Sequence, residues 1–374
     1  MSVMRLLIVF WAVLVGACQG GEDLRTQSAP RSFAEEDPLL LSAWGMLHLT
    51  DSGVAPNAGA VAYGLETPLF SDYAQKLRTV WIPEGGSAHY SEGRLEFPLG
   101  TVLTKTFYYG EALDGAVLAS APVDAAVIDP AANRIIETRV LVRRSEGWEG
   151  LIYLWNEEET DAVLDRTGGR FDLTLVRDGE ERQAFVYAAP NVTQCAGCHA
   201  TDAGDRRIAP LGLSGRNLNR HFPYLEGDAN QIDALSVAGW LTGAPAELEE
   251  AARLVGWSDA TASLDDRARA YLDMNCAHCH NERGAADTSG LILEAEAPFG
   301  RATGLCKLPV AAGAGTGNLR FDIVPGQPAQ SILIYRLHSE DPAVMMPEIG
   351  RAISHREGTA LLSAWIAAME GSCS

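Results

Sequence analysis

The chain has 374 residues, of which 29 are basic and 49 acidic, so its formal net charge at pH 7 is −20. With 47% hydrophobic and 21% charged residues, it has the composition of a globular protein long enough for two or three domains. The acidic balance argues against nucleic acid as a partner, because binding to phosphates requires clustered Lys and Arg. The same repulsion excludes electrostatic docking on anionic lipid.

The first segment of the chain is typical of an export signal. Arg5 precedes the apolar run Leu6–Ala17, which is shorter than the roughly 20 residues that span a bilayer. The run ends in a sequence that resembles the lipobox of bacterial lipoproteins, with Cys18 at the lipidated position. We therefore expect residues 1–17 to be a lipoprotein signal peptide. A plain secretory signal with an incidental cysteine is the alternative.

Lipid on Cys18 would anchor the exported protein without any transmembrane helix. Gln19, which follows the lipidated position, resembles the outer-membrane sorting class of such lipoproteins. The expected location is therefore the outer membrane, facing the periplasm or the cell surface. There the remaining cysteines would lie outside the reducing cytosol.

Residues 30–190 are predicted to form a mainly antiparallel β domain. The segments 101–109, 134–143 and 171–176 are rich in Val, Ile, Thr and aromatic residues, and Asp178-Gly179 predicts a hairpin turn before 183–187. No catalytic constellation is visible in this region. The acidic run 156–161 is interpreted as a solvated loop, with calcium binding as the minor alternative.

Two identical motifs follow this region. Cys195-Ala-Gly-Cys198-His199 and Cys276-Ala-His-Cys279-His280 both match C-x-x-C-H, the attachment signal for c-type haem. In this spacing the two thiols form thioethers to one haem, and the adjacent imidazole binds its iron. We therefore expect two haem c groups, with His199 and His280 as iron ligands. A four-cysteine zinc site or two redox-active disulfides are alternatives, but neither explains a His after both pairs.

Residues 191–260 are predicted to hold the first haem, but its sixth ligand is open. His221 is the one His between the first motif and the second domain, and the helix expected after it has Asp228 as its cap. Met46, His48 or His89 could supply the ligand instead, and an iron with an open position is a further alternative.

Residues 261–374 are predicted to form a class I-like cytochrome c domain. Ser263 with Asp266 predicts a capped helix that leads into the second motif, and Ser354 with Glu357 predicts a capped terminal helix. Between them lies Met346-Pro347, and we expect the Met346 thioether to be the sixth ligand of the second iron, with Met345 as the alternative. A further helix is expected at 331–338, where Arg336 is either a partner for a haem propionate or a solvated charge.

Two cysteines remain in this domain. In an oxidising compartment Cys306 and Cys373 are expected to form a disulfide, with two free thiols as the alternative.

A resemblance to a known family is carried by segments 63–74, 97–101 and 154–157, by Pro190-Asn191 with Gln194-Cys195, by the region around Asn275-Cys276, and by Met346-Pro347. In these segments the chain resembles a family of bacterial di-haem c-type cytochromes. The resemblance implies a mainly antiparallel β N-terminal domain followed by α-helical, cytochrome c-like haem domains, hence a multidomain α+β protein. Members of the family are often encoded beside exported parallel β-helix proteins, which implies such a protein as a partner.

These observations together predict an exported electron carrier with a redox protein as donor and another as acceptor. A di-haem peroxidase-like oxidoreductase with an open first iron is the competing hypothesis. A haem-bearing module that binds a surface polymer is the third.

Overall fold

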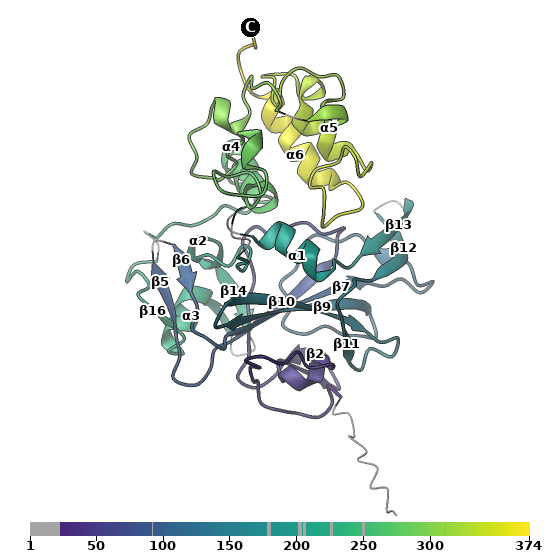
Figure 1. Ribbon diagram of the computed structural model, residues 1–374, viewed down its shortest axis with the longest axis vertical. Helices are drawn as coiled ribbons and strands as arrows, with labels where there is room; N and C mark the ends of the chain where they lie inside the picture. The colour runs from purple at the N-terminus through teal and green to yellow at the C-terminus, as the bar shows by residue number, and fades with distance from the viewer. Residues whose placement is uncertain are drawn as a thin grey trace, which may run out of the picture.

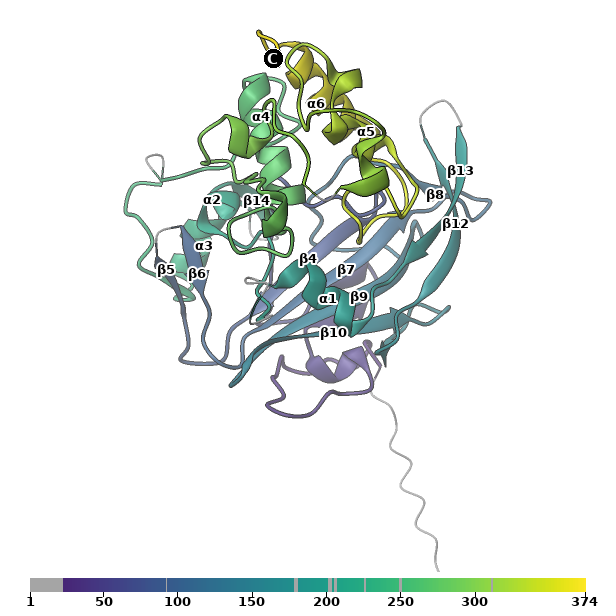
Figure 2. The ribbon, with the colours of Figure 1, turned by 45° about the horizontal axis from the view of Figure 1, so that its top comes forward.

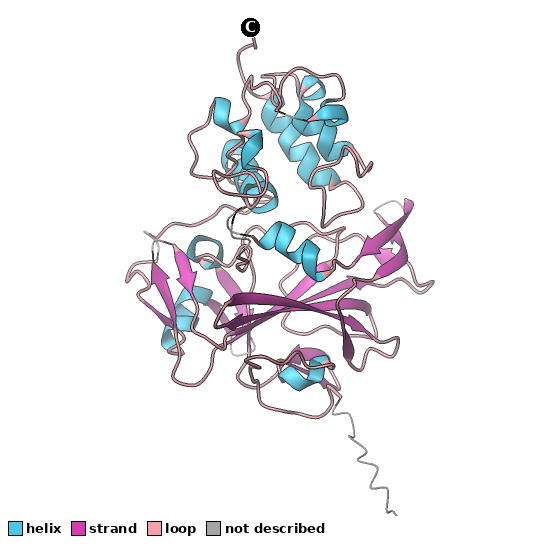
Figure 3. Ribbon diagram, viewed as in Figure 1, coloured by secondary structure: helices cyan, strands magenta, loops and turns pink. Residues whose placement is uncertain are grey.

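The computed structural model describes residues 23–91, 93–177, 181–200, 204, 207–224, 227–248, 251–310 and 312–374. The predicted signal peptide and Cys18 lie outside these residues. The described chain is an α+β fold, in which antiparallel strands predominate before residue 190 and helices predominate after residue 260 (Figure 3).

The largest sheet has six antiparallel strands in the order β11-β10-β9-β7-β4-β3. Two of its strands cover the segments predicted at 134–143 and 101–109, and their Val, Ile and aromatic side chains are mostly buried. The strands are β11 (Ala162–Asp165), β10 (Gly147–Trp155), β9 (Asn133–Arg144), β7 (Val102–Gly110), β4 (Gln75–Trp81) and β3 (Val61–Ala62).

Four smaller sheets surround this one. β12 (Arg170–Val176) and β13 (Arg182–Ala188) form the predicted hairpin, although its turn at 178–179 lies outside the described residues, and β8 (Val117–Leu118) adds to β12 in parallel. In the other small sheets, β1 (Leu47–Thr50) pairs with β2 (Gly53–Pro56), and β14 (His221–Tyr224) pairs with β15 (Gly227–Asn230). β5 (Ala88–Ser91) lies between β6 (Arg94–Glu96) and β16 (Leu241–Thr242) in a three-stranded sheet.

The segment 191–260 folds back onto the β region. It contains α1 (Val192–His199), α2 (Gly215–Leu218) and α3 (Gln231–Val237). Its strand β16 pairs with β5, and Leu218 and Ile232 share a buried cluster with Val80 and Leu103 of the large sheet. The predicted Asp228 cap is wrong: the Asn230 side chain caps α3, and Asp228 lies in β15.

The C-terminal region contains three longer helices, α4 (Leu264–Leu272), α5 (Ile332–His338) and α6 (Arg356–Ala367). α4 continues into a π-helical turn, Asp273–Ala277. Short 3-10 turns occur in this region at Asp287–Ser289, Arg301–Thr303, Gly313–Thr316 and Pro328–Gln330, and a further one precedes β1 at Leu41–Trp44. Ser263 caps α4 as predicted. The Ser354 cap is wrong, because its hydroxyl donates to the Leu337 carbonyl and α6 begins after His355.

The apolar stripes of α4 and α6 build the core of this region. Ala268, Leu272, Leu362 and Ile366 are at most 3% exposed and belong to one buried cluster, to which α5 contributes Leu337. The helices thus pack through the faces that their sequence periodicity predicts.

α1 lies between the large sheet and the C-terminal helices. In Figure 1 it sits directly above β10 and β9, with α4, α5 and α6 above it, and Figure 2 shows the same helix lying along the sheet. The first C-x-x-C-H motif is therefore placed in the layer that separates the two regions.

Candidate functional site

The first motif occupies α1, a helix that the sequence analysis did not anticipate. The Asn191 side chain accepts from the Gln194 N–H at 2.9 Å, and the Gln194 side chain accepts from the Asn191 N–H at 2.9 Å. This reciprocal capping box starts the helix and is visible in the sequence as N-x-x-Q. Cys195 packs near Gly150 of β10, where a Cβ would lie 3.8 Å from the cysteine Cβ.

His199 ends α1 with its ring oriented by the backbone. Its Nδ1 lies 2.7 Å from the Ala209 carbonyl oxygen, and because a carbonyl only accepts, Nδ1 carries the proton. Burial, followed by the charge of the nearby Lys105, lowers the pKa of His199 to about 3. The imidazole is therefore neutral with Nε2 unprotonated, which is the form that binds a metal.

The second motif follows α4 on a firmly held turn. The Asp273 carboxylate accepts from Arg216 at 2.7 and 2.8 Å and from the Ala295 N–H at 2.9 Å. Asn275 donates to the Tyr271 carbonyl at 3.0 Å and accepts from the Phe70 N–H at 2.9 Å. These contacts fix the backbone immediately before Cys276.

His280 is the His of the second motif. Its Nδ1 lies 3.0 Å from Ser289 Oγ, so here too Nδ1 has a protein partner and Nε2 has none among the described residues. Burial lowers the pKa of His280 to about 4, with Arg336 as the next contributor. Both motif histidines are thus neutral and held through the same ring nitrogen.

The two motifs, 82 residues apart in sequence at this contact, touch in space. The Cys279 Sγ lies 3.9 Å from the Gly197 carbonyl oxygen. A Cβ on Gly197 would approach Ile349 Cδ1 to 3.0 Å, so the loop after Met346 also packs closely against α1. The fold therefore brings both candidate haem attachment points to one place.

A cavity of about 240 Å³, which we call the central cavity, lies at this contact. It is lined by Cys195, Cys198, His199, His278, Met345 and Met346, among other residues. A larger cavity of about 1050 Å³, the side cavity, also borders His199 and His278.

Met346 is held by its backbone. Its N–H donates to the Arg336 carbonyl at 3.1 Å, and its carbonyl accepts from the Arg351 guanidinium at 2.8 and 3.0 Å. His280 does not line the central cavity. The Arg336 side chain, however, lies near enough to His280 for its charge to lower the pKa of that imidazole. Arg336 thus neighbours both residues that the sequence assigns to the second iron.

A cationic wall from the large sheet borders the central cavity. Lys105 of β7 and Arg139 of β9 line it, and Arg139 is paired with Glu137 at 2.5 Å. Burial lowers the pKa of Lys105 to about 7, helped by the charges of Arg78 and Arg139. Positive groups in such surroundings suit anionic carboxylates, and sequence reasoning missed them because they lie within strands.

The segment 63–74, which we call the strap, connects the two regions. The Asp72 carboxylate accepts from the Ala352 N–H at 2.8 Å and from the Ile353 N–H at 3.0 Å. Burial raises the pKa of Asp72 to about 6 despite these two bonds. The strap thus holds the loop that follows Met346.

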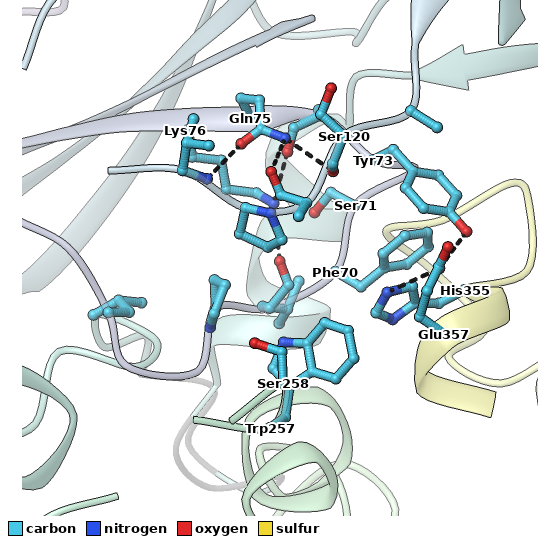
Figure 4. Close-up of a pocket in the computed structure, with 18 of the residues that line it drawn as sticks. Phe70, Ser71, Tyr73, Gln75, Lys76, Ser120, Trp257, Ser258, His355 and Glu357 are labelled. Atoms are coloured by element: carbon cyan, nitrogen blue, oxygen red, sulfur yellow. Dashed lines mark hydrogen bonds and ion pairs between the residues drawn. The ribbon is translucent and has the colours of Figure 1, made fainter. Parts of the chain in front are cut away.

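A second set of strap contacts surrounds a cavity of about 640 Å³ (Figure 4). The Phe70 ring stacks on His355 with 4.2 Å between centroids, and the Tyr73 hydroxyl donates to Glu357 at 2.7 Å. Figure 4 shows these rings meeting where α6 begins. Part of the sequence resemblance therefore rests on residues that join the regions.

The other candidate ligands of the first iron lie elsewhere. His221 is 66% exposed on β14, pairs with Asp228 at 2.7 Å and lines neither the central nor the side cavity. Met46 is buried in the core beneath the large sheet, His48 lies on β1 and His89 on β5. None of these four lines the two cavities that border His199.

The remaining cysteines are also placed. Cys306 and Cys373 form a disulfide. The four motif cysteines carry free thiols, and across the described part of the chain no three or more His, Cys, Asp or Glu side chains are grouped to hold a metal ion.

Comparison of the chain with protein-family models, with curated proteins and with solved structures found no match. Within the residues that the structure describes, no helix has the length and apolar character to cross a bilayer.

Proposed function

We propose that this chain is a di-haem c-type cytochrome that carries electrons through two covalently bound haems. The observation that supports this most is the contact between the two C-x-x-C-H motifs, whose Cys279 Sγ and Gly197 carbonyl lie 3.9 Å apart. Two redox groups attached there would be close neighbours. A haem bound at each motif would supply the iron that accepts and releases one electron.

The residues of the chain fit such a group. Cys195 and Cys198 would hold one haem and Cys276 and Cys279 the other, and His199 and His280 would each bind one iron. Both histidines leave Nε2 free, because Nδ1 is bonded to Ala209 or to Ser289. In this proposal the C-terminal region is the class I-like cytochrome c domain, and Met346 is the second ligand of its iron.

The electrostatics of the site support the same proposal. Lys105 and Arg139 line the cavity beside the first motif, where a bound haem propionate would favour the protonated form of Lys105 and could share Arg139 with Glu137. The formal net charge of the chain is strongly negative, so a basic or neutral redox protein would associate with it more readily than an acidic one. An exported β-helix protein remains the partner that the sequence resemblance suggests.

Export and lipidation are part of this proposal. The electron carrier would be tethered through Cys18, outside the described residues, and would work in the periplasm or at the cell surface. Its membrane attachment would then depend on lipid alone.

The experiment counts haems. Protein matured in cells that attach haem c should give two covalent haems per chain in a pyridine haemochrome assay. Cys195→Ala with Cys198→Ala, and Cys276→Ala with Cys279→Ala, should each remove one, while Cys306→Ala should remove none. A wild-type chain without covalent haem would overturn the proposal.

A further inference from the structure

We infer that His278, which lies between the two cysteines of the second motif, is the second axial ligand of the first haem. The inference rests on the proposed function and deepens it, because it assigns the open position of the first iron. Sequence reasoning overlooked His278, since the two middle positions of C-x-x-C-H have no required identity.

The polar atoms of His278 are the first observation. Its Nδ1 is buried, and it has no hydrogen-bond partner among the described residues. Buried side-chain nitrogens are almost always hydrogen-bonded, so one without a partner requires an explanation. An iron atom can bind imidazole through either ring nitrogen. A bound iron would therefore supply the partner that the buried His278 Nδ1 lacks within the protein.

The position of His278 is the second observation. His278 lines both the central cavity and the side cavity, and His199 lines the same two. The ligand of the first iron and the unpartnered imidazole therefore share one space.

The competing side chains are already engaged. His355 also lines the central cavity, but its ring stacks on Phe70 and its Nδ1 lies 3.0 Å from the Tyr271 hydroxyl. Met345 and Met346 lie on the loop that Arg351 fixes. The proposed function assigns Met346 of this loop to the second iron. Of the imidazoles that line this cavity in the described chain, His278 is the one with a buried Nδ1 that lacks a hydrogen-bond partner of normal geometry, although its ring also interacts with the Met274 backbone.

The backbone at His278 is well positioned for this role. The π-helical turn before it is fixed through Asp273 and Asn275, and the His278 N–H donates to the Cys276 carbonyl. A ligand on so constrained a turn loses little conformational freedom on binding. The residue that ligates one iron would also adjoin Cys279, which holds the other haem, so a single turn would connect both groups.

The test uses the full chain with haem attached, and compares His278→Ala with His221→Ala as the matched control. Wild type and His221→Ala should show two six-coordinate, low-spin haems and bind no carbon monoxide when reduced. His278→Ala should keep two covalent haems by haemochrome assay, convert one of them to a high-spin species in the electron paramagnetic resonance spectrum, and bind about one carbon monoxide per chain. Added imidazole should restore the low-spin spectrum.

The outcomes separate the two proposals. Two haems with an unchanged spin state in His278→Ala would overturn the assignment of His278 and leave the proposed function standing. Carbon monoxide binding by the wild type would also overturn it and would favour an open, peroxidase-like first iron. If His278→Ala does not fold, the His278→Met variant tests the assignment of His278 instead. A thioether at this position should keep the iron six-coordinate and alter its absorption spectrum. An unchanged spectrum would contradict the inference. No haem in the wild type would instead refute the proposed function.

Discussion

The two C-x-x-C-H motifs carry the same pattern of residues, yet the protein supports them in different ways. The first lies on α1, an eight-residue helix with no fully buried side chain, placed on the large sheet. The second lies on a π-helical turn that continues α4, where Met274, Asn275 and Ala277 are buried. The second motif is therefore held by a hydrophobic core, and the first by caps and by contacts with neighbouring layers.

This difference shows that the same residue pattern does not require the same local structure. A pattern of five residues leaves open how rigidly the segment is held, and the surrounding fold decides that. Residues of both motifs border the side cavity and the central cavity, but only the second motif has buried neighbours on its own turn. Changes in the core of the C-terminal region should consequently affect the second motif far more than the first.

The largest expected effect comes from the core that supports the second motif. Leu362 of α6 is completely buried against α4, so Leu362→Ala should lower the free energy of unfolding by about 3 kcal/mol through lost burial and a residual cavity. Chemical denaturation monitored by tryptophan fluorescence measures the loss. The exposed Val237 offers a control, since Val237→Ala should change stability little, and a loss of similar size there would contradict the comparison.

The joint between the two regions should give the next largest effect. Asp72→Ala removes the acceptor of the Ala352 and Ile353 N–H groups and should cost about 2 kcal/mol of unfolding free energy. Asp72→Asn retains one acceptor oxygen and should cost less. Limited proteolysis of the 346–353 loop gives an independent readout, and equal cleavage of all three proteins would show that the strap does not hold this loop.

The caps of the two helices that carry or precede the motifs should each contribute about 1 kcal/mol of stability. One cap should stabilise the whole fold, and the other should stabilise only its own helix. Ser263→Ala should lower global stability, because α4 belongs to the C-terminal core. Asn191→Ala should mainly increase amide hydrogen exchange in 192–199, because the side chains of α1 are exposed or only half-buried. Hydrogen exchange measured by mass spectrometry separates the two cases, and a global effect of Asn191→Ala would erase the distinction between the motifs.

A smaller, pH-dependent effect is expected in the β region, away from both motifs. Burial raises the pKa of Glu159 to about 7, although its carboxylate accepts from the Ile135 N–H at 2.7 Å. The folded state thus holds this proton more tightly than the unfolded state does. The stability it contributes is present below the unfolded pKa and is lost as pH rises through about 7.

Glu159→Gln keeps an acceptor for Ile135 but does not titrate. The variant should therefore melt at a higher temperature than the wild type at pH 8, with a gap that shrinks by pH 5. Melting curves of both proteins at the two pH values measure this. A gap that grows toward low pH would contradict the direction of the shift.

The sequence predicted the second motif's surroundings better than the first motif's. The Ser263 cap and the apolar stripes of α4 and α6 follow from short-range periodicity, and the structure confirms them. The cap predicted at Ser354 was wrong by one position, because a tertiary contact with Leu337 engages its hydroxyl. Local patterns therefore located the elements, and long-range contacts adjusted their ends.

The contact between the motifs could not be predicted in this way. It depends on the strap, whose bonds join residues such as Phe70 and Asn275 that lie 205 positions apart. Lys105 and Arg139 likewise occur in strands whose sequence indicates only a buried sheet, and their approach to the central cavity depends on where α1 packs. The motif residues can be recognised from their spacing alone, but the environment of the motifs depends on tertiary structure.

The disulfide between Cys306 and Cys373 has a consequence for the timing of maturation. A chain emerges N-terminus first, and Cys373 is the last of the seven cysteines to appear. Until then Cys306 lacks its native partner, and the thiols of both motifs are already present in the chain. The correct pairing can form without competition only if the four motif thiols react first. Under the proposed function, the order of the cysteines thus favours haem attachment before the C-terminal helix is covalently closed.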